Sequence, residues 1–297
     1  MITNPFDVPF PALMGQLVLG LVNGSFYAML SIGLAVIFGM LNIINFAHGA
    51  LYMMGAMVAW MLMEYLGLGY WWALLLAPLC VGAFGMLIER LLLQRVHQLD
   101  HIYGLLLTFG LALVIEGLFR YVYGVGGQPY SIPQSLRGAI NLQFMILPRY
   151  RIWVVAISLT VCVATWLIIE KTRLGSYLRA ATENPGLTQA FGINVPVLVT
   201  LTYGIGVALA ALAGVLSAPI MQVSPLMGSN LIIVVFAVVV IGGMGSILGS
   251  IITGLGLGVI EGLTKVIYPP ASSTVIFFIM AVVLVVGPAG LLGRSTK

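Results

Sequence analysis

Charge is scarce in this sequence. Asp, Glu, Lys and Arg make up 7% of its 297 residues, whereas hydrophobic residues make up 61% and the mean hydropathy is +1.13. A soluble domain carries roughly 25% charged residues, so this deficit excludes an ordinary soluble domain and predicts a chain embedded in a bilayer. The apolar runs are too long for the roughly ten-residue alternating strands of a membrane barrel, so we expect helices.

Signatures of catalysis and of metal binding are also missing from the sequence. The two cysteines, Cys80 and Cys162, lie inside apolar runs and form no CxxC pair, which argues against a disulfide framework or a metal site. No Walker A, HExxH or GxSxG motif occurs, so the chain has no P-loop of its own and no familiar protease or lipase signature. We therefore expect a non-catalytic chain that binds no cofactor.

Acidic residues deep in the apolar runs, which a proton-driven carrier or an intramembrane enzyme would need, are almost absent. Four glutamates are expected at helix ends or in loops: Glu64, Glu89, Glu170 and Glu183. Glu116 precedes Arg120 by four residues, and Glu261 precedes Lys265 by the same spacing, which is the favoured order for an ion pair on one helix. For Glu116 we favour this ion pair over the alternative of a proton relay.

The apolar segments predict an all-α polytopic membrane domain of about nine spanning helices, within a range of eight to ten, over residues 1–297. The segments are 12–41, 50–63, 71–93, 102–122, 152–169, 197–218, 231–264 with an interruption at 242–246, and 274–293. Lys and Arg gather near residues 90–95, in 171–179 and at the C-terminus, places separated by even numbers of spans. All three can therefore be cytoplasmic, which puts the N-terminus and the connection 123–150 on the other side. Three arginines oppose this orientation: Arg137, Arg149 and Arg151.

A polar island at residues 170–196 separates two apolar runs and carries its own helix signals. Asn184 is a good N-cap, Pro185 suits the first helical position, and Gly192 suits the residue just past the end. The apolar side chains of this short helix share one face: Leu187, Ala190 and Phe191. Because about two turns are too short to be stable alone, we expect a docking helix for a soluble partner. The alternative is a loop folded back on the chain's own helix ends.

Two breaks, at residues 42–49 and 242–246, interrupt apolar runs near the start and late in the chain. Such paired discontinuities suggest an internal repeat and a solute path, to which helix starts could present backbone N–H groups. The residues expected to line or gate this path are Asn42, Asn45, His48, Gly49, Gly242, Gly243, Gly245 and Ser246. A small residue recurs at every fourth position from Ser246 to Gly262, for which a static helix crossing is the favoured interpretation.

A transporter-like bundle without an energy source, but with a docking helix, predicts that a separate subunit drives it. The alternative from another class is a stand-alone channel or facilitator for a small neutral solute, in which the polar island is merely a loop. Solute flux through the purified protein without ATPases would favour that alternative.

Motifs along nearly the whole chain resemble those of one family. They are GLVNGSFYA from Gly20, NFAHG from Asn45, RAATENP from Arg179, GINV from Gly192, ALAGVL from Ala211, IGGMGS from Ile241 and GLLGR from Gly290. The family is that of LivH-type permeases of branched-chain amino acid ABC importers. In this family the coupling region corresponds here to residues 179–192, of which we single out Arg179, Glu183, Asn184, Pro185, Leu187, Ala190, Phe191 and Gly192.

The resemblance implies a multi-pass subunit of the bacterial inner membrane that pairs with a second, LivM-type permease. It also implies two cytoplasmic ABC ATPase subunits, which bind the ATP, a periplasmic substrate-binding protein and no nucleic acid. Residues 171–196 would form the cytoplasmic coupling loop and residues 123–150 a periplasmic loop. Similar permeases carry urea or short amides, and no buried charge that could pair with a zwitterion is expected, so all three solutes stay open.

Overall fold

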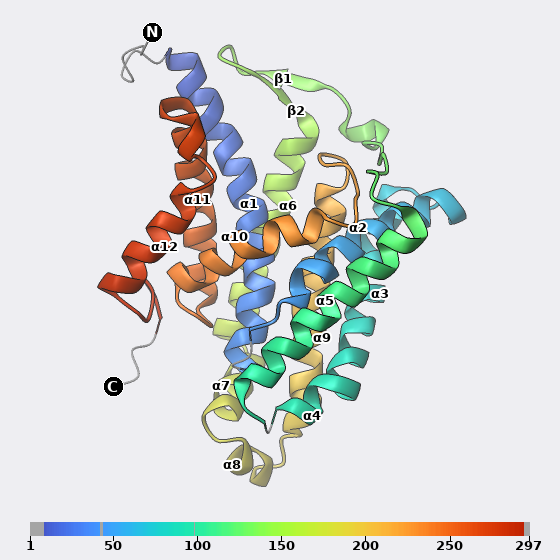
Figure 1. The fold of residues 1–297 in the computed structure, drawn as a ribbon, viewed down its shortest axis with the longest axis vertical. Coiled ribbons are helices and arrows are strands. Elements are labelled where there is room, and N and C mark those ends of the chain that lie inside the picture. The colour runs from blue at the N-terminus through green and yellow to red at the C-terminus, as the bar shows by residue number, and fades with distance from the viewer. Residues whose placement is uncertain (1–8, 42–43, 98, 294–297) are drawn as a thin grey trace. The chain divides into compact units, whose positions relative to one another are not determined.

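A computed structural model describes residues 9–41, 44–97 and 99–293 of the chain (Figure 1). The chain divides into two compact units. The first unit consists of Met1–Ser31, Ile132–Cys162 and Val234–Lys297, and the second of Ile32–Ser131 and Val163–Ile233. Three helices contribute residues to both units: α1 (Phe10–Leu41), α6 (Arg149–Lys171) and α10 (Met227–Gly242).

Seven helical segments within the described ranges are long and apolar enough to cross a membrane. They are α1, α2 (Ala47–Leu66), Tyr70–Val96, α5 (His101–Tyr123), α6, α9 (Val195–Ser217) and α11 (Ile247–Ile267). Two shorter apolar helices, α10 and α12 (Val275–Val286), complete the nine apolar segments. The chain is therefore an all-α polytopic membrane protein. However, α12 extends only about 18 Å, less than the roughly 30 Å of a bilayer core.

The segment Tyr70–Val96 is not one regular α-helix. It consists of α3 (Tyr70–Ile88), a π-helical turn, η1 (Glu89–Leu93), and α4 (Gln94–Val96). A π-turn carries one extra residue and changes which side chains face a neighbouring helix. This irregularity brings Glu89 into the interior of the second unit, where none of its surface is exposed.

Small residues join α1 to α11 in the first unit. A Cβ added to Gly20 would lie 2.6 Å from the carbonyl oxygen of Gly258, and one added to Gly258 would lie 2.3 Å from the Cα of Gly24. Gly254 likewise contacts Ala28. The repeat of small residues on α11 is therefore a close helix crossing, as the favoured interpretation of the sequence predicted.

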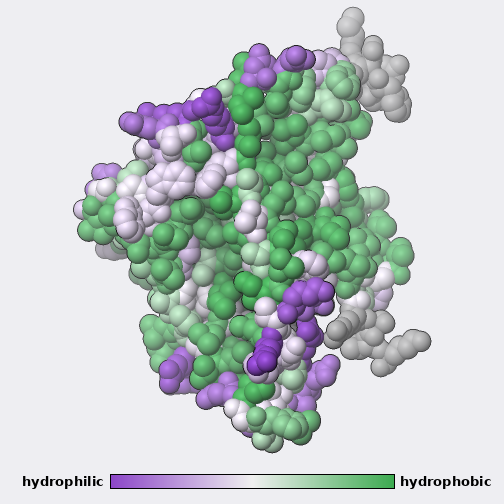
Figure 2. Space-filling view, turned by 180° about the vertical axis from the view of Figure 1, so that it is seen from behind, coloured by the Kyte–Doolittle hydropathy of each residue, from purple (hydrophilic) through white to green (hydrophobic). Residues whose placement is uncertain are grey.

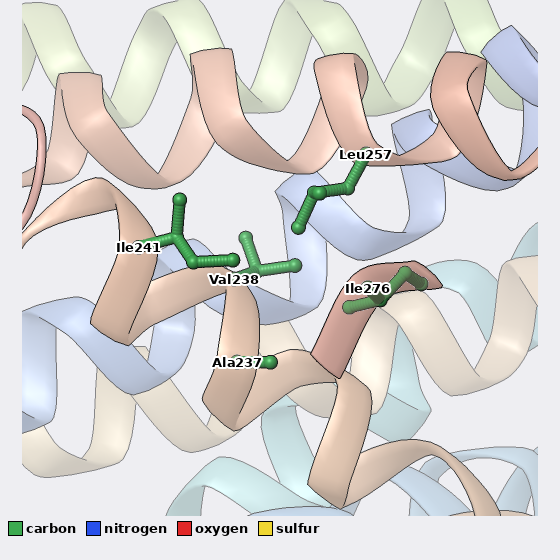
Figure 3. Packing of buried hydrophobic residues seen from close by; sticks show 5 residues of the cluster. All are labelled: Ala237, Val238, Ile241, Leu257 and Ile276. Atoms are coloured by element: carbon green, nitrogen blue, oxygen red, sulfur yellow. The ribbon is translucent and has the colours of Figure 1, made fainter. Parts of the chain in front are cut away.

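The apolar core of the first unit lies where α10, α11 and α12 meet (Figure 3). Its fully buried members are Ala237, Val238 and Ile241 on α10, Leu257 on α11 and Ile276 on α12. The expected last segment ran to residue 293, but α12 ends at Val286. Gly287 and Pro288 explain this early end, because proline has no backbone N–H and disfavours a helical residue before it.

Helix α9 is the centre of the second unit, with α2 and α3 packed against it. The approach is close because small residues face each other: a Cβ on Gly55 would lie 2.3 Å from the carbonyl oxygen of Ala211. Tyr52 of α2 donates a 2.7 Å hydrogen bond to the Ser217 hydroxyl of α9. These contacts make α2, α3 and α9 one packed group of helices.

The connection at residues 123–150 contains structure that the sequence did not predict. A short 3-10 turn, η2 (Gln134–Leu136), precedes an antiparallel hairpin of β1 (Ala139–Asn141) and β2 (Ile146–Pro148), in which Ile140 pairs with Leu147. Gln128 forms an isolated bridge with Val223, which follows α9. The connection is therefore ordered at both ends.

Apolar side chains cover most of the face shown in Figure 2. Helix α5, which lies at the front of Figure 1, also exposes apolar side chains along its length: Leu106, Phe109 and Leu113. Both expected helical ion pairs form, Arg120 with Glu116 and Lys265 with Glu261, each at 2.6 Å. A surface of this kind suits contact with lipid, with charges neutralised near helix ends.

Candidate functional site

The polar island folds into two helices, α7 (Arg173–Glu183) and α8 (Pro185–Ala190). The Asn184 side chain accepts a 2.9 Å hydrogen bond from the backbone N–H of Leu187, and Pro185 occupies the first helical position. Gly192 follows the helix end with φ +84°, a conformation that favours glycine. The expected short helix is therefore confirmed, with its N-cap, its first residue and its terminating glycine.

The apolar face of α8 is open. Leu187 is 56% exposed and Phe191 79% exposed, and Ala190 is exposed as well. Thr188, on the other face, is the buried residue of this helix. A loop folded back on the chain would cover the apolar face instead, so the structure contradicts that alternative.

Helix α7, which the sequence analysis missed, holds α8 in place. Its apolar face buries Leu178 and Ala181, and the Thr182 hydroxyl lies 3.3 Å from the carbonyl oxygen of Gly39 at the end of α1. Arg179 contacts the end of α6, with Nη1 3.4 Å from a Glu170 carboxylate oxygen.

Arg179 thus lies on the anchoring side of the polar island and not on its open face, whereas Glu183, the last residue of α7, is exposed. The spacing of Leu174, Leu178 and Ala181 was the overlooked sequence signal for α7, because it places all three on one helical face.

Residues 90–95 lie at the same end of the second unit as the polar island (Figure 1). Gln94 Nε2 donates a 3.4 Å hydrogen bond to the hydroxyl of Thr200, which lies near the start of α9. Since α9 begins directly after the polar island, the two basic segments lie at one end of the second unit. That this end is cytoplasmic stays a prediction.

The first break belongs to the second unit. Asn42 lies outside the described residues, but Asn45 is 2% exposed and donates a 3.1 Å hydrogen bond from Nδ2 to the Tyr203 hydroxyl. Its Oδ1 atom has no hydrogen-bond partner within the described part of the chain. The break therefore presents one unused buried acceptor beside α9.

Two further residues of this break, His48 and Gly49, are packed closely. The His48 ring is fully buried, and a Cβ on Gly33 would lie 3.0 Å from its Cε1 atom. A Cβ on Gly49 would lie 2.7 Å from the carbonyl oxygen of Gly228. Gly33 and Gly49 therefore leave no room for a side chain, which explains both glycines structurally.

Thr108 of α5 binds the backbone of the first break, a role that the sequence analysis missed. Its hydroxyl accepts a 3.3 Å hydrogen bond from the Phe46 N–H and lies 3.1 Å from the carbonyl oxygen of Ile44. The Phe46 N–H at this helix start is therefore engaged within the chain. Whether other N–H groups of this helix start face a solute stays a prediction. A lone threonine within an apolar run was the available signal.

The second break belongs to the first unit and is closed by the C-terminal segment. Gly243 and Gly245 have φ values of +99° and +83°, and the Ser246 hydroxyl caps α11 by accepting from the Gly249 N–H at 3.1 Å. Leu291 and Leu292 donate hydrogen bonds to the last carbonyls of α10.

These contacts give the glycines of the second break a packing role. Gly242 and Gly243 are buried against the chain itself, whereas Gly245 and Ser246 are half-buried. The N-cap contact engages the Gly249 N–H at this helix start within the chain. If this break contributes to a solute path, Gly245 and Ser246 are the residues that can do so.

Glu89 corrects the expectation that no charge-bearing group is buried. It follows the last residue of α3, but the helical segment continues through η1 to Val96, so Glu89 does not lie at a helix end as expected. Its side chain lies inside the protein, with Oε2 within hydrogen-bonding distance of the Thr200 hydroxyl. This burial could not be predicted from the sequence, because it involves packing of η1 against α9, which lies far along the chain.

Comparison with known proteins identifies relatives over the whole chain. The sequence model of the family described as branched-chain amino acid transport system, permease component, matches residues 16–285. The permease protein LivH of the high-affinity branched-chain amino acid transport system of Salmonella typhimurium is 30% identical over 96% of this chain and 97% of its own length. The corresponding permease protein BraD of Pseudomonas aeruginosa is 31% identical over 94% and 95%.

A more distant relative is the probable LivH permease protein of Methanocaldococcus jannaschii, which is 27% identical over 93% of this chain and 91% of its own length. No solved structure gives a significant match. With a family match that covers most of the sequence and a fold of apolar helices, the chain belongs to the family of permease components of branched-chain amino acid transport systems.

Proposed function

We propose that this chain is the transmembrane permease subunit of an ABC importer in a bacterial inner membrane. It moves a branched-chain amino acid, or a similar small polar solute such as urea or a short amide, inward. Separate ATPase subunits docked on the polar island supply the energy. The open apolar face of α8 carries this proposal, together with relatives named as permease proteins of such transport systems.

The docking role follows from the physics of α8. A six-residue helix has too few internal hydrogen bonds to be stable alone, yet it is held here by the Asn184 cap and by α7. Phe191 and Leu187 remain exposed on a segment outside the apolar runs, where a large apolar side chain gains free energy only when a partner covers it. A groove on each ATPase subunit is the partner that we propose.

The transmission of movement follows from the contacts of α7. Thr182 joins it to the end of α1, and Arg179 joins it to the end of α6, while α9 begins right after α8. A push on α8 therefore reaches three helices at once. In the proposed cycle, ATP binding closes the ATPases, the polar island moves as a rigid lever, and this chain and a second LivM-type permease rock to open the path on alternate sides.

The solute path is proposed to pass the polar residues of the first break. Asn45 offers Oδ1 as a buried acceptor for an N–H or O–H of the solute, and His48 follows within one helical turn. Gly245 and Ser246 are the corresponding candidates of the second break. A periplasmic substrate-binding protein delivers the solute and sets selectivity among related solutes.

Reconstitution in liposomes tests the proposal. With the second permease, both ATPases and the binding protein present, labelled leucine should accumulate inside only when ATP is supplied on the ATPase side. Flux through this chain alone, without ATP, would support a stand-alone channel and contradict the proposal. The relatives do not favour that alternative, since they are named as permease components of transport systems.

A further inference from the structure

Glu89 is a buried carboxyl group without a cationic partner. Its side chain is 0% exposed, and the ion pairs formed among the described residues involve only Glu116, Glu170 and Glu261. One of its oxygens, Oε1, has no hydrogen-bond partner within the described part of the chain. An isolated carboxylate in such a place is costly, and a group of this kind normally takes up a proton instead of remaining charged.

The hydrogen bonds around Thr200 point to the same state. A threonine hydroxyl has one hydrogen to donate and two lone pairs to accept with. Here the Thr200 hydroxyl is within hydrogen-bonding distance of Glu89 Oε2 and, at 3.1 Å, of the carbonyl oxygen of Pro196. It also accepts from Gln94 Nε2. If Glu89 were ionised, Thr200 would face two acceptors with one hydrogen.

A proton on Glu89 removes this conflict. Oε2 then donates to the Thr200 hydroxyl, and the Thr200 hydroxyl donates to the Pro196 carbonyl, so that each donor has an acceptor. The second lone pair of Thr200 remains for Gln94.

We propose that Glu89 holds a proton and donates a hydrogen bond to Thr200, and that this bond fastens the π-helical turn η1 to α9. Glu89 is a positioning residue in this arrangement, and its proton stays on the carboxyl group without crossing the membrane. Thr200 lies in the second turn of α9, shortly after the polar island in the sequence. Its hydrogen bond therefore passes a displacement of α9 on to α3. This last step rests on the proposed function, whereas the proton on Glu89 does not.

Arg90, the residue after Glu89, carries a charge that favours the ionised carboxylate, and the burial of Glu89 outweighs this attraction. Helices α3, α4 and α9 pack against η1. Arg90 on η1 and Arg95 on α4 are exposed at the surface. Tyr203, one turn further along α9, accepts its hydrogen bond from Asn45.

The Glu89→Gln variant tests the proposal, because a glutamine amide can donate to Thr200 but cannot be ionised. Infrared spectra of the purified protein at neutral pH should show the carbonyl stretch of a protonated carboxylic acid, and Glu89→Gln should lack that band. The matched control is Glu64→Gln, which changes an exposed carboxyl and should leave the band in place. A wild-type spectrum without a band assignable to Glu89 would overturn the proposal.

Uptake measurements distinguish whether position 89 needs a hydrogen-bond donor or an ionised carboxylate. In the reconstituted importer, Glu89→Gln should keep ATP-driven uptake within about twofold of the wild type, and Glu89→Ala should reduce it at least tenfold, which corresponds to about 1.4 kcal/mol. Loss of uptake in a folded Glu89→Gln protein would show that an ionised carboxylate is needed and would refute the proposal. If the wild type itself shows no uptake, the proposed function fails, and the infrared band still decides the state of Glu89.

Discussion

The backbone N–H of Leu291 donates a 2.8 Å hydrogen bond to the carbonyl oxygen of Ile241, and this contact joins the C-terminal segment to the last turn of α10. Beside it, Gly290 has φ +78° and a Cβ added there would lie 2.6 Å from the Cα of Gly243. The second break is therefore held by a segment distant in sequence.

Gly290→Ala should weaken this closure. The new methyl group meets backbone atoms and occupies a left-handed conformation, so we expect a cost of about 1–3 kcal/mol, seen as a lower Tm of the detergent-solubilised protein. Gly287→Ala is the matched control, because its Cβ would come no closer than 4.0 Å to another residue and its φ is negative. Equal stability of the two variants would argue against the closure.

Gly258→Ala should disturb the crossing of α1 and α11. The added Cβ would lie 2.3 Å from the Cα of Gly24, so the helices must separate and lose packing along the crossing. Gly256→Ala on the same helix meets nothing within 4 Å and should be neutral or stabilising by up to about 1 kcal/mol. Thermal unfolding of both variants measures this difference in stability. Equal stability of the two variants would indicate a loosely packed crossing.

Thr108→Val should destabilise the first break, because the Phe46 N–H and the Ile44 carbonyl lose their common partner. Leaving buried polar groups unsatisfied costs about 1–3 kcal/mol. Thr108→Ser keeps the hydroxyl and should retain most of the stability and the uptake rate. If valine were tolerated as well as serine, the threonine would serve packing alone.

His48→Ala tests whether the first break lines the path. We expect ATP-driven uptake to fall at least tenfold while the complex still assembles, as measured by size-exclusion chromatography. Unchanged uptake would leave the break with a structural role only.

Local signals in the sequence predicted the elements that depend on local chemistry. Asn184, Pro185 and Gly192 specify α8 because a cap, a first-turn proline and a terminating glycine act within a few residues of one another. The small residues of α11 predicted a close crossing for a similar reason, since their spacing creates a flat helical face.

The features that could not be predicted from the sequence depend on contacts between residues far apart in the chain. Glu89 looks like an ordinary helix end until η1 and α9 bury it, and the closure of Gly243 by Gly290 joins residues far apart in the chain. Thr108 acquires its role only when α5 packs against the first break. The roles of Asn45, His48, Gly245 and Ser246 in a solute path remain predictions.

Binding-protein-stimulated ATP hydrolysis by the reconstituted complex is the most direct test of the importance of α8. Phe191→Asp places a charge on its open apolar face and should abolish the stimulation, while the permease still inserts into the membrane. Gln189→Asp adds the same charge to an exposed polar position of α8 and should leave the stimulation near the wild-type level. Normal stimulation in the Phe191→Asp complex would contradict a docking role for α8.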